Sequence, residues 1–184
     1  MQNIILTSTG FTNKNIEEKF LSLVNVPNDK IKVIFIPTAA ITEDARVWIP
    51  ICKNDLLEAG ILGDNIVTYD LDRIMSCDEI CNFNAIYVCG GTTEHLLSKM
   101  NETKFNIPLK KFLGKGGVYV GVSAGSVALS RNLPDNLGYI NCTLDVHAEE
   151  GSECGYLNTS DCPNIKLTDN QAIIIIDSNI TIIE

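Results

Sequence analysis

The sequence of 184 residues is short of basic residues and of long apolar runs, and each shortage excludes a class of protein. Lys and Arg number 14 against 23 Asp and Glu, so the formal net charge is −9. Because nucleic acid is bound by a basic face, this balance argues against a nucleic-acid partner. Asp177 interrupts the longest apolar run, residues 172–183, and no stretch is long enough to span a membrane. We therefore expect neither nucleic acid nor a membrane as a partner.

Signals for secretion and for metal binding are missing as well. Residues 1–10 lack the positive start and the long apolar centre of a signal peptide. The seven cysteines are odd in number and form no C-x-x-C motif, and no histidine accompanies the close pair Cys77 and Cys81. The sequence thus predicts a cytoplasmic protein with reduced cysteines, several of them small core residues, and with neither a metal nor another cofactor.

The residues that are present predict one folded domain over residues 1–184. Apolar residues make up 45% of the chain, which is long enough to bury one sizeable core. Short apolar runs alternate with segments of helix length, which predicts an α/β fold with a mostly parallel sheet flanked by helices on both faces. Strands are expected over residues 3–8, 32–37, 65–71, 84–91 and 116–122, helices over 12–24, 43–59, 92–100 and after Ser123, further strands within 138–147, and a hairpin over 171–183.

One predicted strand-to-helix junction carries the stretch Gly121-Val-Ser123-Ala-Gly125. It matches G-x-S-x-G, in which a sharp turn exposes the serine and the glycines let the strand and the helix pass close to their neighbours. The helix N-terminus would also bring free N–H groups and its positive dipole end near the serine hydroxyl. Ser123 is therefore the predicted nucleophile, and the alternative is a helix cap that follows a tight turn.

A nucleophilic serine needs a base, and the sequence offers only His95 and His147. His95 falls inside a predicted helix, whereas His147 ends a strand-like segment and can reach the end of another strand, so His147 is favoured. A carboxylate would hold the imidazole in the correct tautomer. The residues near His147 leave several candidates open, namely Asp135, Asp145, Glu149 and Glu150.

The reaction would also need donors for a developing oxyanion. The N–H of Ala124 directly follows the serine, and a second donor could come from Gly90 or Gly91, where another predicted strand ends. The alternative is that Gly90 and Gly91 have no catalytic role, because a tight turn before a helix would need the same glycines. Cys89 is a rival nucleophile by residue type, but it falls within the strand and is better interpreted as a core residue.

Five segments extend these motifs over nearly the whole chain: IFIPTAA (34–40), AIYVCGGTTEHLL (85–97), GVYVGVSAGSVALS (117–130), LGYINCTLDVH (137–147) and LTDNQAIIIIDSNITII (167–183). Together, and in this order, they resemble the peptidase S51 family, which includes dipeptidase E and the cyanophycinases. The resemblance implies a fold like that of class I glutamine amidotransferases, a flavodoxin-like three-layer sandwich, and a monomer or a homodimer.

The resemblance also implies roles for individual residues. Ser123 would be the nucleophile and His147 the base, with Ala124 and a glycine of the Gly90–Gly91 pair as the oxyanion hole. In dipeptidase E, the carboxylate that completes the catalytic triad falls between the serine and the histidine in the chain, which favours Asp135 here. The implied activity is that of a serine peptidase acting on short peptides.

One departure from the family concerns specificity. Dipeptidase E recognises peptides with an N-terminal aspartate. The resemblance therefore implies a basic residue downstream of the histidine that pairs with the aspartate side chain. The three arginines, Arg46, Arg73 and Arg131, all precede His147, and Lys166 is the sole basic residue after it. Because a buried carboxylate without a cation is costly, the sequence argues against aspartyl specificity unless a residue such as Arg131 supplies the charge.

Two other functions use the same residues differently. An esterase or amidase would apply the same triad to a non-peptide acyl substrate, and a non-catalytic relative would keep the fold only to bind a small molecule.

Overall fold

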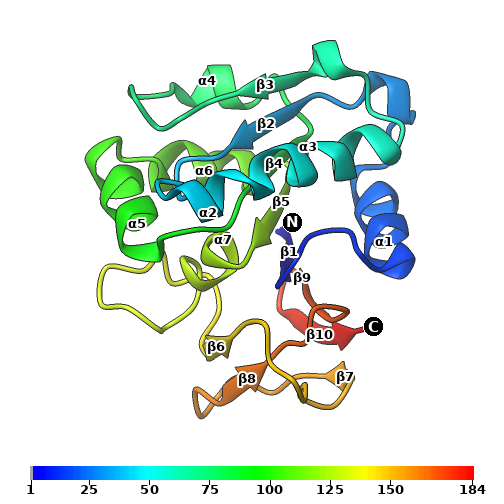
Figure 1. Ribbon diagram of the computed structural model, residues 1–184, viewed down its shortest axis with the longest axis vertical. Coiled ribbons are helices and arrows are strands. Elements are labelled where there is room, and N and C mark those ends of the chain that lie inside the picture. The colour runs from blue at the N-terminus through cyan, green and yellow to red at the C-terminus, as the bar shows by residue number, and fades with distance from the viewer. Residues whose placement is uncertain (1) are drawn as a thin grey trace.

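The computed structural model describes residues 2–184 and is built on a mostly parallel sheet (Figure 1). Five parallel strands lie side by side in the order β3-β2-β4-β5-β1. Their bounds are β1 Asn3–Thr7, β2 Val33–Ile36, β3 Ile66–Thr68, β4 Ala85–Val88 and β5 Val118–Val122. Four of them are short runs of mainly β-branched and aromatic residues that are buried along their whole length, as expected for strands covered on both faces.

The C-terminal part of the chain extends this sheet with antiparallel strands. Strands β9 (Ala172–Ile176) and β10 (Asn179–Ile183) form the predicted hairpin, which turns at Asp177 with φ 54°. β9 pairs with β1, and β7 (Gly155–Tyr156) closes the edge beyond β10. The sheet therefore has eight strands, and the described N-terminal strand lies between the parallel and antiparallel halves.

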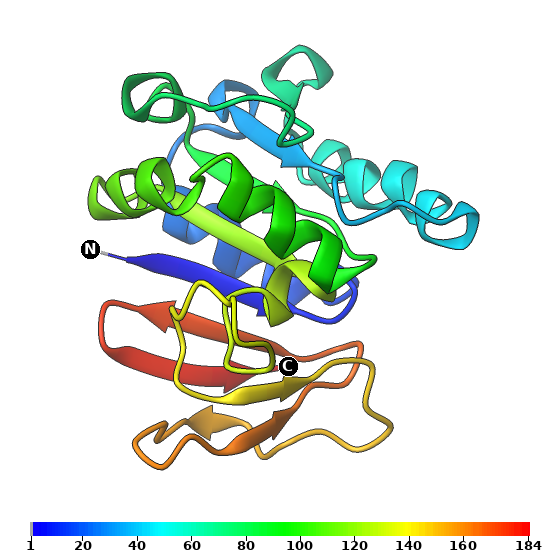
Figure 2. The same ribbon diagram turned by 90° about the vertical axis from the view of Figure 1, so that its left-hand side faces the viewer.

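A separate two-stranded sheet lies beside the main one (Figure 2). It consists of β6 (Thr143–Asp145) and β8 (Asn164–Lys166), which run parallel to each other. Its register pairs Leu144 with Ile165, and both side chains are buried against the main core. β6 falls within the predicted strand region 138–147, whereas β8 was not predicted.

Alternate strand residues point to opposite faces of the main sheet, so that each face has its own hydrophobic core. Ile5, Phe35 and Tyr87 belong to the core under helices α1 (Lys14–Val24) and α3 (Trp48–Glu58). α1 begins at its cap Asn13, whose side chain accepts from the N–H of Asn15, and buries Ile16 and Phe20 on one face.

The opposite face is covered by α5 (Thr93–Glu102), α6 (Asn106–Gly114) and α7 (Ala124–Val127). Figure 2 shows α5 and α6 in front of the sheet and α1 behind it. The prediction of an α/β fold with helices on both faces is therefore confirmed.

Several predicted helices differ from the observed ones. The helix expected over residues 43–59 is two helices, α2 (Glu43–Arg46) and α3, which meet at Val47. Pro50 has no N–H to donate to the carbonyl of Arg46, so the helical hydrogen bonds are interrupted there. α2 begins at Thr42, whose hydroxyl accepts from the N–H of Ala45. The helix after Ser123 has only four residues, and neither α6 nor the short α4 (Cys77–Ile80) was predicted.

Candidate active site

Ser123 stands at a sharp turn between β5 and α7. Its backbone has φ 48° and ψ −107°, a conformation that is uncommon for a residue with a side chain and costs local strain. The Ser123 N–H donates to the carbonyl of Thr7 at 2.9 Å, which ties the turn to β1. Beneath it, the fully buried Ser126 hydroxyl lies 2.8 Å from the carbonyl oxygens of both Thr7 and Gly121 and accepts from the Thr7 N–H. These contacts hold a strained turn in place.

The two glycines of the motif are required by close packing. A Cβ at Gly121 would lie 2.6 Å from the carbonyl oxygen of Gly125, and one at Gly125 would lie 2.6 Å from that of Val88. Real side chains do not come this close to backbone atoms. The expectation that these glycines let strand and helix pass closely is confirmed at both positions.

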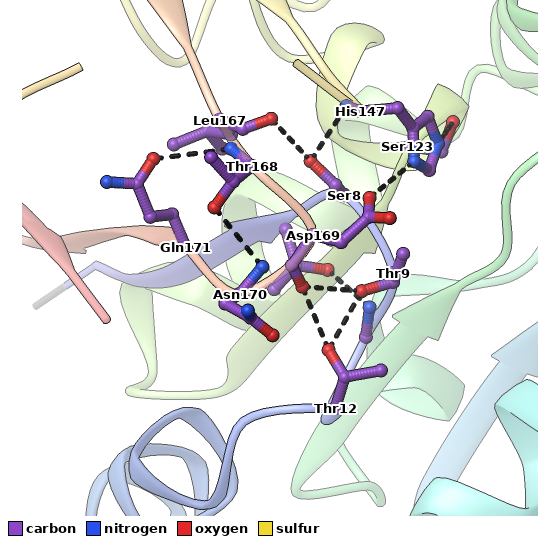
Figure 3. Close-up of polar contacts among 12 residues, drawn as sticks. Ser8, Thr9, Thr12, Ser123, His147, Leu167, Thr168, Asp169, Asn170 and Gln171 are labelled. Atoms are coloured by element: carbon purple, nitrogen blue, oxygen red, sulfur yellow. Dashed lines mark hydrogen bonds and ion pairs between the residues drawn. The ribbon is translucent and has the colours of Figure 1, made fainter. Parts of the chain in front are cut away.

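His147 lies between Ser123 and a carboxylate (Figure 3). Its Nε2 is 3.1 Å from the Ser123 hydroxyl oxygen, and its Nδ1 is 2.7 Å from Oδ1 of Asp169. With Nδ1–H donating to Asp169, Nε2 is free to accept the Ser123 O–H. The structure thus joins Ser123, His147 and Asp169 in one hydrogen-bonded chain.

The small sheet explains why His147 and Asp169 meet. β6 and β8 are parallel neighbours, so the segments that follow them emerge at the same end. His147 follows β6 by two residues, and Asp169 follows β8 by three. Backbone hydrogen bonds between the two segments continue beyond the strands, since the Ala148 N–H donates to the Leu167 carbonyl at 3.0 Å.

Residues from the end of β1 hold this arrangement against the main sheet. The Ser8 hydroxyl accepts from the His147 N–H and donates to the Leu167 carbonyl, both at 3.1 Å. The hydroxyls of Thr9 and Thr12 donate to the Asp169 carbonyl at 2.7 and 2.9 Å (Figure 3). The backbone of His147 itself adopts φ 59°. Asp169 is therefore fixed through its backbone as well as through its carboxylate.

Asp135 was the predicted third residue, and the structure corrects this prediction. Asp135 lies in the loop after α7, where its carbonyl accepts from the Asn101 side chain at 3.3 Å, and Nδ1 of His147 is occupied by Asp169. The three residues in contact follow one another in the chain as Ser123, His147 and Asp169, whereas the resemblance implied a carboxylate between the serine and the histidine.

The other candidate carboxylates also lie elsewhere. Asp145 accepts from the side chain of Asn164 at 3.0 Å, and Glu149 and Glu150 line a separate surface hollow with Lys166. The sequence contained a signal for Asp169, because Thr168-Asp169-Asn170 is a turn-forming stretch directly before the final hairpin.

The predicted oxyanion residues surround Ser123. A Cβ on Gly90 would lie 3.0 Å from the Ser123 Cβ and 3.6 Å from its hydroxyl oxygen. Gly91 has φ 139°, and a Cβ there would lie 2.1 Å from the carbonyl oxygen of Ala39. Within residues 2–184, the backbone N–H groups of Gly90, Gly91 and Ala124 have no partner in the chain. Unpartnered N–H groups therefore occur in the residue after Ser123 and in the glycine pair beside it.

A cavity of about 550 Å³ opens over these groups. Its floor includes Ser123, His147, Asp169 and the glycine pair at 90 and 91, and one wall comes from α2 and α3. The side chains of His147 and Asp169 are 47% and 59% exposed, so solvent and ligands can reach both. The volume is of the size that accommodates small molecules or short peptides.

The rival residues from the sequence lie outside this arrangement. Cys89 is buried, and its hydrogen bond with Cys52, followed by burial, raises the pKa of its thiol well above the ordinary value. A thiol held protonated in the core is a poor nucleophile, which supports the interpretation of Cys89 as a core residue. His95 lines a different cavity, and Arg131 is exposed in the loop after α7.

Residues 2–184 contain no helix long and apolar enough to cross a membrane. The same residues hold no cluster of three or more His, Cys, Asp or Glu side chains arranged to bind a metal ion.

The fold and the geometry define a class of protein, a mostly parallel α/β protein with a serine, a histidine and an aspartate in contact at the carboxyl ends of its strands. The chain belongs to peptidase family S51, whose family model matches residues 4–137. This match includes Ser123 and the Gly90–Gly91 pair but stops before His147 and Asp169. The contacts of those two residues therefore come from the structure alone.

Several proteins of similar sequence are named as peptidases. The chain is 30% identical over 135 residues to an uncharacterized peptidase of Listeria monocytogenes, covering 72% of this chain and 63% of that one. It is 28% identical over 109 residues to an uncharacterized peptidase of Pasteurella multocida, covering 59% of this chain and 52% of that one. It is 31% identical over 99 residues to peptidase E of a Nostoc species, covering 52% and 38%. The chain thus spans between about a third and two thirds of the curated relatives that it matches.

Solved structures agree on the fold. A crystal structure of a candidate peptidase E from Listeria monocytogenes superimposes with a TM-score of 0.75 at 22% identity, covering 100% of this chain and 98% of that one. A peptidase from an acI-B1 actinobacterium gives a TM-score of 0.69 at 16% identity, covering 100% and 87%.

Proposed function

We propose that the chain is a serine peptidase that hydrolyses short peptides, with Ser123, His147 and Asp169 as its catalytic triad. The observation that carries the proposal is the continuous chain of contacts, 3.1 Å from Ser123 to His147 and 2.7 Å from His147 to Asp169, at the floor of an open cavity. Membership of peptidase family S51 supports peptide bonds as the substrate.

The first half of the reaction uses the serine hydroxyl. Ser123 Oγ attacks the carbonyl carbon of the scissile bond while Nε2 of His147 accepts the hydroxyl proton. The imidazolium that forms keeps its Nδ1–H on the Asp169 carboxylate, which stabilises the positive charge. His147 then donates the proton to the leaving amine, and an acyl-enzyme remains on Ser123.

The second half repeats these steps with water. His147 accepts a proton from water, which attacks the acyl carbon, and Ser123 leaves with that proton. In both halves the negative oxygen of the tetrahedral intermediate faces the free N–H groups of Ala124 and of Gly90 or Gly91. These donors are fixed before the reaction begins, so their alignment costs little during it.

The peptidase proposal is tested by labelling Ser123 with a fluorophosphonate, a reagent that forms a covalent bond with an activated serine. We expect mass spectrometry to find the label on Ser123 in the native chain, and no label in either His147→Gln or Ser123→Ala. Labelling at Cys89, or none in the native chain, would contradict the proposal. Turnover of short-chain esters without turnover of any dipeptide would assign the same triad to an esterase instead.

A further inference from the structure

The active-site cavity carries an unusual balance of charge for a family that includes aspartyl dipeptidases. Its charged or ionisable oxygen and nitrogen groups belong to Asp44, His147 and Asp169. Among the residues that the structure describes, no Lys or Arg lines the cavity. A substrate carboxylate in this cavity would therefore meet negative charge without a cation to offset its lost hydration.

The chain's arginines all lie elsewhere. Arg46 and Arg73 line a neighbouring cavity, where Arg73 is already paired with Glu79. Arg131 is exposed in the loop after α7, and its backbone N–H donates to the carbonyl of Cys142 at 2.7 Å. Arg131 does not line the cavity, so it does not supply the positive charge for which the sequence offered it as an example.

Asp44 is suited to a positively charged group. It lies in the first turn of α2, is exposed to solvent and lines the cavity that contains Ser123. Its carboxylate forms no ion pair with any other group of residues 2–184. The free α-amino group of a peptide carries the complementary charge and three N–H donors.

Trp48 supplies the apolar part of the same wall. Its side chain is 56% exposed and belongs to neither hydrophobic core, although it is the largest side chain type in the protein. Together with Ala45, Cys52 and Val122 it gives the cavity an apolar surface. A ligand side chain that covers the indole ring would remove apolar surface from water on both partners.

We propose that this cavity selects peptides with a free N-terminus and an uncharged apolar first residue, with Asp44 pairing the α-ammonium and Trp48 packing against the first side chain. The proposal rests on the peptidase function above and specifies its substrate class. It predicts the reverse of aspartyl specificity, because an N-terminal aspartate would place its side chain against Trp48 and near Asp44.

The experiment measures binding separately from catalysis. Titration calorimetry on Ser123→Ala, which cannot form an acyl-enzyme, would compare three dipeptides: Leu-Gly, Asp-Gly and N-acetyl-Leu-Gly. We expect Leu-Gly to bind at least about tenfold more tightly than Asp-Gly, the size of effect that an apolar contact gives. Over N-acetyl-Leu-Gly we expect an advantage of up to about fivefold, the size of effect that an exposed charge pair gives. Equal binding of the three, preference for Asp-Gly, or no binding of any would overturn the proposal.

A second substitution in the Ser123→Ala chain tests whether Asp44 and Trp48 cause the preference for Leu-Gly. In the same background, Asp44→Asn should remove most of the advantage of the free amino group, and Trp48→Ala should remove most of the advantage of leucine. Glu43→Gln and Val47→Ala are the matched controls, because they make similar changes on neighbouring residues that do not line the cavity. Controls that weaken binding as much as the test variants would also overturn the proposal.

Failure of this proposal can be distinguished from failure of the peptidase function. Labelling of Ser123 by the fluorophosphonate does not depend on peptide side chains. A chain that is labelled but prefers Asp-Gly keeps the function and loses the specificity, whereas a chain that binds Leu-Gly but is never labelled keeps the binding site and loses the chemistry.

Discussion

The protein has two cavities at the carboxyl ends of its strands, and each contains one of its two histidines. His147 lies in the cavity of about 550 Å³ with Ser123 and Asp169, and His95 lies in the neighbouring one of about 710 Å³. The larger cavity has more charged side chains, contributed mainly by α5 and by the segment after β3. Size and charge alone would therefore select a different cavity from the one that we propose as the active site.

The two cavities differ in how their polar groups are arranged. In the larger cavity Lys99 pairs with Glu102 at 2.8 Å, the Thr38 hydroxyl donates to Asp70 at 2.8 Å, and Arg73 pairs with Glu79. In the smaller cavity, free N–H groups and a serine–histidine–aspartate chain converge on one point. Convergence of reactive groups that remain available to a ligand is what identifies a catalytic site.

The largest difference between the cavities should appear when the histidines are exchanged for glutamine. We expect His147→Gln to lower kcat/KM on a cleaved dipeptide on the order of 10⁶-fold, because the base is lost. His95→Gln, the matched control, should leave kcat/KM unchanged. A loss of activity in His95→Gln as well would mean that both cavities take part in the reaction.

The next largest effect compares the two aspartates. Asp169→Asn should lower kcat about 10⁴-fold, because an amide can no longer stabilise the correct tautomer and the charged form of His147. Asp135→Asn should change kcat little. Steady-state kinetics on the two purified variants makes the comparison, and the opposite ranking would restore Asp135 as the third member.

A smaller effect is expected from added bulk beside the serine. Gly90→Ala would place a methyl group 3.0 Å from the Ser123 Cβ, so either residue must shift. We expect kcat/KM to fall about 10²-fold with little change in the unfolding midpoint, since small displacements of reacting groups are costly.

Gly114→Ala is the matched control, because a Cβ there meets nothing within 4 Å. It ends α6 and precedes β5, whereas Ser123 follows β5, so the two lie at opposite ends of that strand. The substitution should stabilise the fold by about 0.5–1 kcal/mol without changing activity. Equal activity in the two alanine variants would show that the space beside Ser123 is not restricted.

The smallest effect concerns α3, which contributes residues to both cavities. Asp55 anchors this helix by accepting from the Phe11 N–H at 3.0 Å and the Tyr87 hydroxyl at 2.7 Å. Burial raises the pKa of Asp55 above its ordinary value. The folded state then binds this proton more tightly than the unfolded state.

The sign of the pH dependence follows from that shift. The contribution of Asp55 to the free energy of unfolding is fully present below its unfolded pKa of about 3.9 and declines as the pH rises through the higher folded pKa. The stability difference between the native chain and Asp55→Asn should therefore decline from pH 4 toward neutrality in urea titrations. A difference that grows with pH would contradict the assignment.

The sequence predicted those parts of the fold that depend on local patterns. The five strands of the parallel core and the C-terminal hairpin were recognised because their apolar runs are short, continuous and bounded by turn residues. The turn at Ser123 was recognised from its G-x-S-x-G motif. Close packing requires the glycines of that motif at positions 121 and 125, so the tertiary contact leaves a local trace in the sequence. The break between α2 and α3 shows the limit: Pro50 interrupts the helical hydrogen bonds there, but proline is also tolerated in the first turn of a helix, so its presence alone did not divide the predicted helix.

Asp169 was missed for a physical reason. Its strand, β8, has three residues, two of them exposed, and it lies within a segment rich in polar residues. So short a strand has little periodicity of its own and forms because β6 is available to pair with it. Without β8, Asp135 was preferred because the resemblance places the carboxylate between the serine and the histidine, and residues 145, 149 and 150 stayed open because they are close to His147 in the chain.

The sequence by itself determined the alternation of strands and helices and the exposure of a serine at one turn, because neighbouring residues decide both. Tertiary structure alone decided which carboxylate meets His147 and which of the two cavities has free donors. Those outcomes depend on pairing between segments about twenty residues apart, and no local pattern encodes that pairing.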